Sequence, residues 1–149
     1  MPEPTRTDQP PSARTEPSVK APVILLAQGG WWCPSIVERL TSRGACVEDA
    51  SDLVGLLRLL TARRVSCILL GTRFAGEIGL EVARLLASER SGRDVPIVMI
   101  AEDGMLLRPA SLAGTRVRYV VTSRVHAGEL ADCLLRCVAE PRSVAPRAA

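Results

Sequence analysis

The chain has 149 residues, of which 47% are hydrophobic, enough for one domain with a substantial apolar core. Its longest apolar runs, such as residues 23–27, fall far short of the roughly 18 residues that a membrane-spanning helix requires. Of the formal net charge of +3, the segment 21–140 carries only +1 and the tail residues Arg142 and Arg147 supply the other +2. Neither a large basic face nor a helix-turn-helix or zinc-finger pattern indicates nucleic-acid binding.

Both ends of the chain are predicted to be disordered. Residues 1–20 are rich in Pro, Thr, Ser and balanced charge, and residues 141–149 read PRSVAPRAA. Such segments bury too little apolar surface to offset the entropy of ordering the chain. We therefore expect one folded domain at residues 21–140. We expect it in the cytoplasm, because the leader lacks the basic start and apolar run of a signal peptide.

The first half of the folded segment alternates between predicted strands and predicted helices. The run VILLA at residues 23–27 is apolar throughout, which is typical of a strand buried on both faces. A helix is predicted from Pro34, a favoured first-turn residue, to a stop at Gly44. A brief strand at 45–48 follows, and Asp52 can cap the leucine-rich helix after it.

The same alternation continues through the second half of the chain. The expected elements are a strand at 67–70, a helix beginning at 80–86, a strand at 96–101, a weak helix at 104–113 interrupted by Pro109, a strand at 118–121 and a last helix over 130–138. Five strands that alternate with helices predict an α/β fold, with a parallel sheet covered on both faces. The flavodoxin-like strand order 2-1-3-4-5 is favoured at this length.

The cysteine pattern predicts reduced thiols and no metal site. The chain has five cysteines, at positions 33, 46, 67, 133 and 137. The number is odd and no export signal is present, so mostly buried free thiols are expected. The last two cysteines are one helical turn apart, but no second Cys/His pair completes the four ligands that zinc requires.

The segment ILLGTRFAGEIGLEVARLL, residues 68–86, resembles a stretch of response-regulator receiver (CheY-like) domains. In that family, aliphatic residues precede a phospho-accepting Asp, and a Met-Pro-Gly and a Gly-Leu-Glu follow it. Here Gly76, Gly79, Leu80 and Glu81 match that pattern. Weaker matches, in SRGACVEDASD, PIVMIAED and AGTRVRYVVTS, follow the family's order. The resemblance covers about residues 22–139 and implies a flavodoxin-like, five-stranded parallel sheet.

The phosphorylation chemistry of receivers needs five groups, and the resemblance places each on a residue that cannot supply it. The acidic pair that holds Mg²⁺ falls on Gln28 and Gly29, and the phospho-accepting Asp falls on Gly71. The hydroxyl position is Ala101 and the lysine position is Thr122. Magnesium sites use carboxylate ligands, and glycine offers no nucleophile. We therefore expect a degenerate receiver that is no enzyme and binds no cofactor.

These losses indicate a pseudo-receiver: a phosphorylation-independent protein–protein interaction module in bacterial two-component signalling or regulation. Its partners would be proteins, with a homodimer through the fourth helix, the fifth strand and the last helix as one form. Neither nucleic acid nor membrane is expected as a partner. The candidate partner-binding residues are Trp31, Trp32, Leu106, Leu107, Arg116, Arg118, Tyr119 and Asp132.

Three of these candidates have alternative interpretations. One tryptophan could cover the vacated acidic pocket while the other anchors a partner, or both Trp31 and Trp32 could cover the first helix. Tyr119 matches the aromatic residue that changes rotamer in phosphorylated receivers. It could be a residual switch, but a side chain that simply covers the sheet is the favoured interpretation.

Two other functions remain open. The carboxyl edge of the strands could bind a small molecule or nucleotide through residues 28–30 and 72–73, although a lone Gly-Gly is a weak signal. Cys33 could be a reactive thiol of a sensor or enzyme, since Pro34 and the start of a helix follow it.

Overall fold

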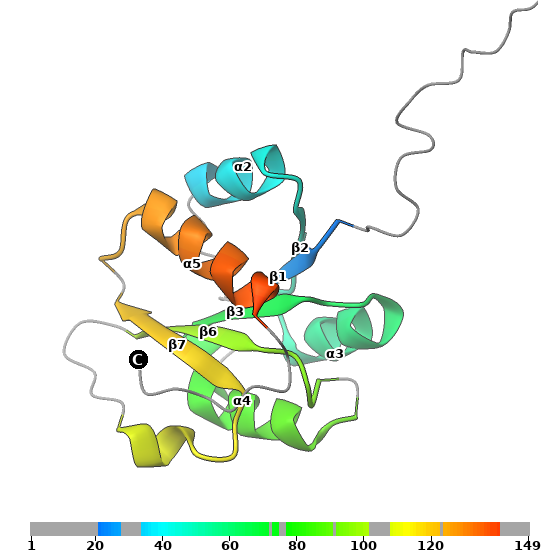
Figure 1. The fold of residues 1–149 in the computed structure, drawn as a ribbon. Helices are drawn as coiled ribbons and strands as arrows, with labels where there is room; N and C mark the ends of the chain where they lie inside the picture. The colour runs from blue at the N-terminus through cyan, green and yellow to red at the C-terminus, as the bar shows by residue number, and fades with distance from the viewer. Residues whose placement is uncertain are drawn as a thin grey trace, which may run out of the picture.

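The computed structural model describes residues 21–27, 34–71, 73–74, 77–90, 92–101, 108–122 and 124–140. A five-stranded sheet in the order β2-β1-β3-β6-β7 lies at the centre, and every pair within it is parallel. Helices cover both faces of this sheet (Figure 1). The predicted flavodoxin-like (CheY-like) α/β fold is confirmed, because β6 and β7 are the fourth and fifth strands of the sheet. The predictions for residues 1–20 and 141–149 lie outside the described residues.

The three central strands are buried along their whole length. They are β1 (Val23–Ala27), β3 (Cys67–Gly71) and β6 (Ile97–Ala101). Continuous apolar runs suit these positions, because helices cover a parallel sheet on both faces. The two edge strands, β2 (Cys46–Asp49) and β7 (Val117–Thr122), are more exposed.

Two apolar layers hold the helices to the sheet. On one face, α2 (Pro34–Ser42) and α5 (Ala127–Ala139) pack over one buried cluster. On the other face, α3 (Leu53–Ala62) and α4 (Gly79–Ser88) cover the second cluster. Each helix buries one stripe of side chains, as its sequence spacing predicts.

The predicted helix boundaries agree with the structure in the first half of the chain. Helix α2 begins at Pro34, and Gly44 follows its end with a φ of +90°, a conformation that favours glycine. The side chain of Asp52 caps α3, since its Oδ1 accepts a hydrogen bond of 2.7 Å from the amide of Gly55.

The prediction around Pro109 was partly wrong. Pro109 begins a short 3-10 helix, η2 (Pro109–Leu112), instead of interrupting a longer one. A proline fits the first position of a helix, because its missing N–H has no intrahelical partner there. Residues 102–107, where the weak helix was expected to start, lie outside the described residues.

A small hairpin after β3 was not predicted. Strands β4 (Arg73–Phe74) and β5 (Glu77–Ile78) pair antiparallel, and Phe74 is fully buried in the cluster beneath α3 and α4. A fully buried aromatic side chain anchors the connection between β3 and α4. The hairpin therefore positions the chain that leaves the carboxyl end of β3.

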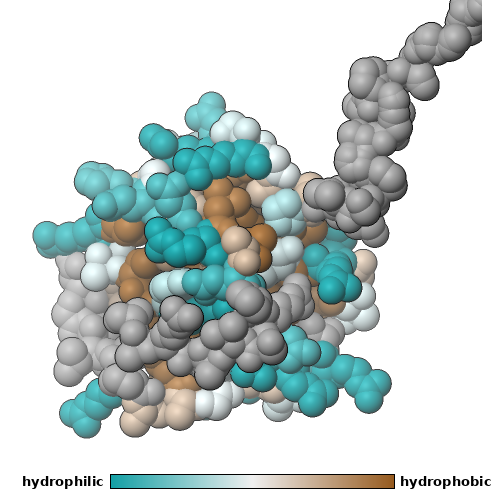
Figure 2. Space-filling view, viewed as in Figure 1, coloured by the Kyte–Doolittle hydropathy of each residue, from teal (hydrophilic) through white to brown (hydrophobic). Residues whose placement is uncertain are grey.

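The visible surface is mixed. Charged and polar side chains cover much of it, and hydrophobic residues show between them (Figure 2). Among the described residues, the large hydrophobic side chains that are exposed are Val54 and Ile78. Within the same part of the chain, no helix has the length and apolar character needed to cross a membrane.

Candidate functional site

Three residues that the family resemblance places at phosphorylation positions end three neighbouring strands. Gly71 ends β3 and pairs with Ile100 of β6, and Ala101 ends β6 and pairs with Thr122 of β7. Adjacent strands lie about 4.8 Å apart, so these three residues form one continuous stretch of the sheet edge. Gly71 and Ala101 are buried, whereas Thr122 is exposed.

This stretch carries little reactive chemistry. Gly71 has no side chain, and Ala101 presents only a methyl group at the position where the family pattern has a hydroxyl. Thr122 supplies a neutral hydroxyl in place of a cation. These three positions therefore offer neither an acceptor carboxylate nor a countercharge for a phosphoryl group. Gln28 and Gly29, the remaining two positions, lie outside the described residues.

Asp49 is a carboxylate at the same edge that the sequence analysis did not single out. It ends β2, is exposed, and pairs with Leu26 of β1. Because β1 lies between β2 and β3, Asp49 is two strand spacings, roughly 10 Å, from β3. It therefore does not replace the carboxylate missing at Gly71. Among the described residues, no group of three or more His, Cys, Asp or Glu side chains is arranged to hold a metal ion.

The alternative hypothesis is that the carboxyl edge of the strands binds a small molecule or nucleotide, and most of the residues that it names are not described. Residues 28–30 and Thr72 lie outside the described part of the chain, and Arg73 is exposed at the start of the β4–β5 hairpin. Cys33, the candidate reactive thiol, also lies outside it. Both hypotheses stay predictions.

The structure is similar to solved receiver domains. A CheY-like receiver domain protein from Methanospirillum hungatei superposes with a TM-score of 0.67 at 12% identity, covering 80% of this chain and 94% of that one. The receiver domain of a Francisella response regulator superposes with a TM-score of 0.66 at 14% identity, covering 78% of this chain and 96% of that one. The receiver domain of a Pseudomonas aeruginosa sensor histidine kinase superposes with a TM-score of 0.65 at 21% identity, covering 80% of this chain and 99% of that one. The structure of that receiver domain has a magnesium ion coordinated in the active-site cleft.

These likenesses define the class of fold. The chain has the receiver fold over its folded segment, as its sequence resemblance implied. No protein-family model and no curated protein matches the sequence. At identities this low the agreement lies in the backbone architecture, so any function has to be argued from this chain's own residues.

Tyr119 and Arg118 both contact the carboxylate of Glu140, the residue that caps the end of α5. The Tyr119 hydroxyl donates a hydrogen bond to Oε2 of Glu140, and Arg118 Nη1 lies 3.1 Å from Oε1. Tyr119 is partly buried against the α2–α5 cluster. The hydrogen bond to Glu140 raises the pKa of Tyr119. This arrangement agrees with a tyrosine that covers the sheet.

A bulge in β7 explains how two consecutive residues reach one carboxylate. Ile97 of β6 pairs with Val117, but the next residue, Val98, pairs with Tyr119. Arg118 is therefore an extra residue in β7, and the register shifts by one at this point. In a regular strand, consecutive side chains point to opposite faces, so the bulge is what allows both Arg118 and Tyr119 to meet Glu140.

Arg118 is buried at this bulge and is not exposed on the predicted partner-binding surface. Its side chain is only 6% exposed. Arg118 was predicted to be one of the partner-binding residues of the face formed by the fourth helix, the fifth strand and the last helix. A guanidinium that is buried against a carboxylate contributes to the fold and is not available to a partner.

The other described candidates are engaged by different parts of the fold. Arg116 Nε donates a hydrogen bond of 2.8 Å to the carbonyl of Arg93. Asp132 in α5 forms an ion pair of 2.7 Å with Arg43, which follows α2. Arg116 and Asp132 therefore face different elements. The remaining candidates, Trp31, Trp32, Leu106 and Leu107, lie outside the described residues.

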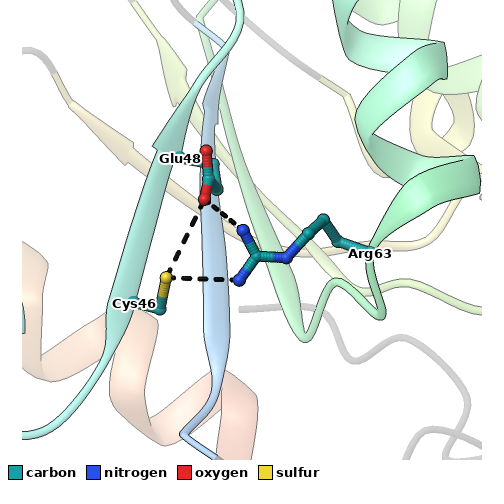
Figure 3. Close-up of polar contacts among 3 residues, drawn as sticks. All are labelled: Cys46, Glu48 and Arg63. Carbon is teal, nitrogen blue, oxygen red and sulfur yellow. Dashed lines mark hydrogen bonds and ion pairs between the residues drawn. The ribbon is translucent and has the colours of Figure 1, made fainter.

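The four described cysteines are free thiols. Cys46 lies between Glu48 and Arg63, which also form an ion pair with each other (Figure 3). Arg63 Nη2 is 3.4 Å from the Cys46 sulfur, and this contact raises the pKa of Arg63. The cluster joins the edge strand β2 to the end of α3. The other three cysteines, at positions 67, 133 and 137, are buried.

Proposed function

We propose that this protein is a pseudo-receiver that acts in signalling by binding protein partners, without being phosphorylated and without catalysing a reaction. The observation that carries the proposal is Gly71, which ends the buried strand β3 where a receiver's acceptor carboxylate would stand. A phosphoryl group transferred to a receiver needs an oxygen nucleophile, and glycine has none. Signal transfer then depends on which surface the partner recognises.

Two neighbouring residues support the same conclusion. Ala101 and Thr122 pair with each other at the ends of β6 and β7. Neither provides the positive charge that stabilises a transferred phosphoryl group. A single substitution would therefore not restore the chemistry. A cytoplasmic location and a bacterial two-component context belong to the proposal, as does the possibility of a homodimer.

Partner capture tests this function. The full-length chain is used to capture proteins from extracts of its source cells, and each purified partner is then titrated with and without acetyl phosphate and Mg²⁺. We expect the same Kd under both conditions. A Kd that changes only when phosphodonor and Mg²⁺ are both present would show that the chain is a phosphorylation switch.

A variant pair locates the binding surface. Replacing Trp31 and Trp32 with Ala is expected to weaken partner binding at least about tenfold, because buried aromatic anchors dominate many interfaces. Arg58→Ala, at an exposed position on α3, is the matched control and is expected to leave the Kd unchanged. Equal effects of both changes would remove the tryptophans from the proposed surface.

A further inference from the structure

Arginines gather at the amino edge of the sheet, the edge opposite the phosphorylation positions. The strand arrows of the five-stranded sheet run the same way (Figure 1), so the connections that precede β3, β6 and β7 all lie at this edge. These connections are residues 63–66, 89–96 and 113–116, and together they contain five arginines and two carboxylates. Because the segment 21–140 has a net charge of only +1, this edge is more positive than the folded segment as a whole.

Two of the five arginines have structural partners. Arg63 forms an ion pair with Glu48 of β2. Arg116 donates a hydrogen bond of 2.8 Å from Nε to the carbonyl of Arg93, and its Nη2 lies 4.0 Å from Asp94. Arg116 therefore ties the start of β7 to the connection between α4 and β6.

The side chains of the other three arginines have no such partners. Arg64, Arg90 and Arg93 are exposed, and within the described residues none of their guanidinium groups forms an ion pair. A positive charge directly after α3 or α4 interacts favourably with the helix dipole, but this effect fades within one turn and does not account for Arg93. These three guanidinium groups are therefore available to a partner.

The connection that carries Arg90 and Arg93 packs against the end of α3. Gly92 is buried, and a side-chain carbon added at this glycine would lie 3.4 Å from Cδ1 of Leu60. Leu60 belongs to the last turn of α3, and Arg64 follows that helix. The two segments that carry the three exposed arginines are therefore neighbours in space.

Turn hydrogen bonds fix the backbone of the same connection. The amide of Gly92 donates to the carbonyl of Glu89 across 3.2 Å, and the amide of Val95 donates to the carbonyl of Gly92 across 3.2 Å. The hydrogen bond from Arg116 holds the carbonyl of Arg93 as well. A surface with a fixed backbone loses less conformational freedom when it binds a partner.

We propose that Arg64, Arg90 and Arg93 form a docking surface for an acidic segment of a protein partner. This surface rests on the proposed function, since it is where the pseudo-receiver would contact its partner. A guanidinium group donates paired hydrogen bonds to a carboxylate, so three neighbouring arginines suit a segment with several Asp or Glu residues. So small a surplus of charge does not match the row of phosphate contacts that holds a nucleic acid.

Fluorescence anisotropy with a defined peptide tests the docking surface. The probe is a fluorescein-labelled peptide of repeated Glu-Ser, and a Gln-Ser peptide of equal length is the uncharged control. We expect the full-length protein to bind the Glu-Ser peptide, with a Kd that rises as salt is added, because salt screens exposed charges. Absence of binding, or equal binding of the Gln-Ser peptide, would overturn the proposal. Tighter binding of a single-stranded oligonucleotide than of the Glu-Ser peptide would also overturn it.

Charge variants locate the surface. Replacing Arg64, Arg90 and Arg93 together with Gln should weaken binding of the Glu-Ser peptide about tenfold, because three exposed ion pairs of modest strength are lost. The matched control removes the same charge from three exposed arginines elsewhere and should change the Kd less than about twofold. The control positions are Arg39, Arg58 and Arg108. Equal losses in the two variants would assign the effect to net charge and overturn the docking surface.

Unfolding midpoints verify that both variants fold, as expected for changes at exposed positions. If the first triple variant does not fold, Arg93→Gln alone should still weaken peptide binding about twofold. An unchanged Kd in a folded Arg93→Gln protein would contradict the proposed surface.

The peptide titrations contain no phosphodonor, so they are independent of the test of the proposed function. If the Glu-Ser peptide does not bind, the docking surface is wrong and the proposed function still stands on its own test. A partner Kd that changes with acetyl phosphate and Mg²⁺ would instead overturn the proposed function, and with it the role given to this surface.

Discussion

The hydroxyl of Tyr119 in β7 donates a hydrogen bond to the carboxylate of Glu140 at the end of α5. Arg118, the extra residue of the bulge, forms an ion pair of 3.1 Å with the same carboxylate. One carboxylate therefore joins the edge strand to the end of the last helix. This contact holds the ring of Tyr119 in the packed structure, where it lies against the α2–α5 cluster.

Glu140→Gln should destabilise the protein by about 2 kcal/mol, because it removes the charged partner of a buried guanidinium. The measurement is the urea unfolding midpoint. Glu81→Gln is the matched control, since Glu81 pairs with Arg84 across 3.3 Å at an exposed site. That change should cost less than about 0.5 kcal/mol. Equal effects of the two variants would contradict a structural role for Glu140.

Tyr119→Phe removes the hydroxyl and should cost about 1 kcal/mol at neutral pH. The pKa of Tyr119 is raised above its ordinary value of 10.0, so the folded state favours the protonated phenol. This contribution is complete below pH 10.0 and is lost as the pH rises through the folded-state pKa. Unfolding midpoints of both proteins, measured up to alkaline pH, should therefore converge. A difference that grows with pH would contradict the hydrogen bond to Glu140.

Phe74→Ala should cost about 3 to 5 kcal/mol, because Phe74 is fully buried and its removal leaves a cavity beneath α3 and α4. If this variant does not fold, Phe74→Leu should still show a smaller loss. The control is Val54→Ala, since Val54 is 63% exposed and should matter by less than about 0.5 kcal/mol. Similar unfolding midpoints for the Phe74 variants and the control would show that the hairpin is not anchored by this residue.

Asp52→Ala should destabilise the protein by about 1 kcal/mol, because α3 loses the side chain that accepts a hydrogen bond from the Gly55 amide. Asp52→Asn keeps an oxygen acceptor at the cap and should recover most of the loss. Thermal and urea unfolding of the three proteins measure the difference. An Asn variant as unstable as the Ala variant would show that the cap hydrogen bond is not the cause.

The sequence predicted the parts of the fold that local pattern determines. Apolar runs such as residues 23–27 indicate buried strands, and Pro34, Gly44 and Asp52 mark helix ends through backbone geometry that each residue favours by itself. The end of β3 at Gly71 was also predictable, because the apolar run of this strand leads directly into the residues that resemble the receiver family.

The contacts between distant segments could not be predicted in the same way. Periodicity shows which face of an element is apolar, but it does not show which residue lies opposite. The bulge at Arg118 depends on the pairing of β7 with β6, and no pattern within β7 itself indicates it. Asp132 likewise looked free for a partner, because nothing in the sequence places it beside Arg43.

The most direct test of the central claim is the intact mass of the full-length protein after incubation with acetyl phosphate and Mg²⁺. A receiver domain that phosphorylates readily is treated in parallel as the positive control. We predict that this chain gains no phosphoryl group, because Gly71 offers no acceptor at the end of β3. A phosphoryl adduct that forms only when Mg²⁺ is present would contradict the account.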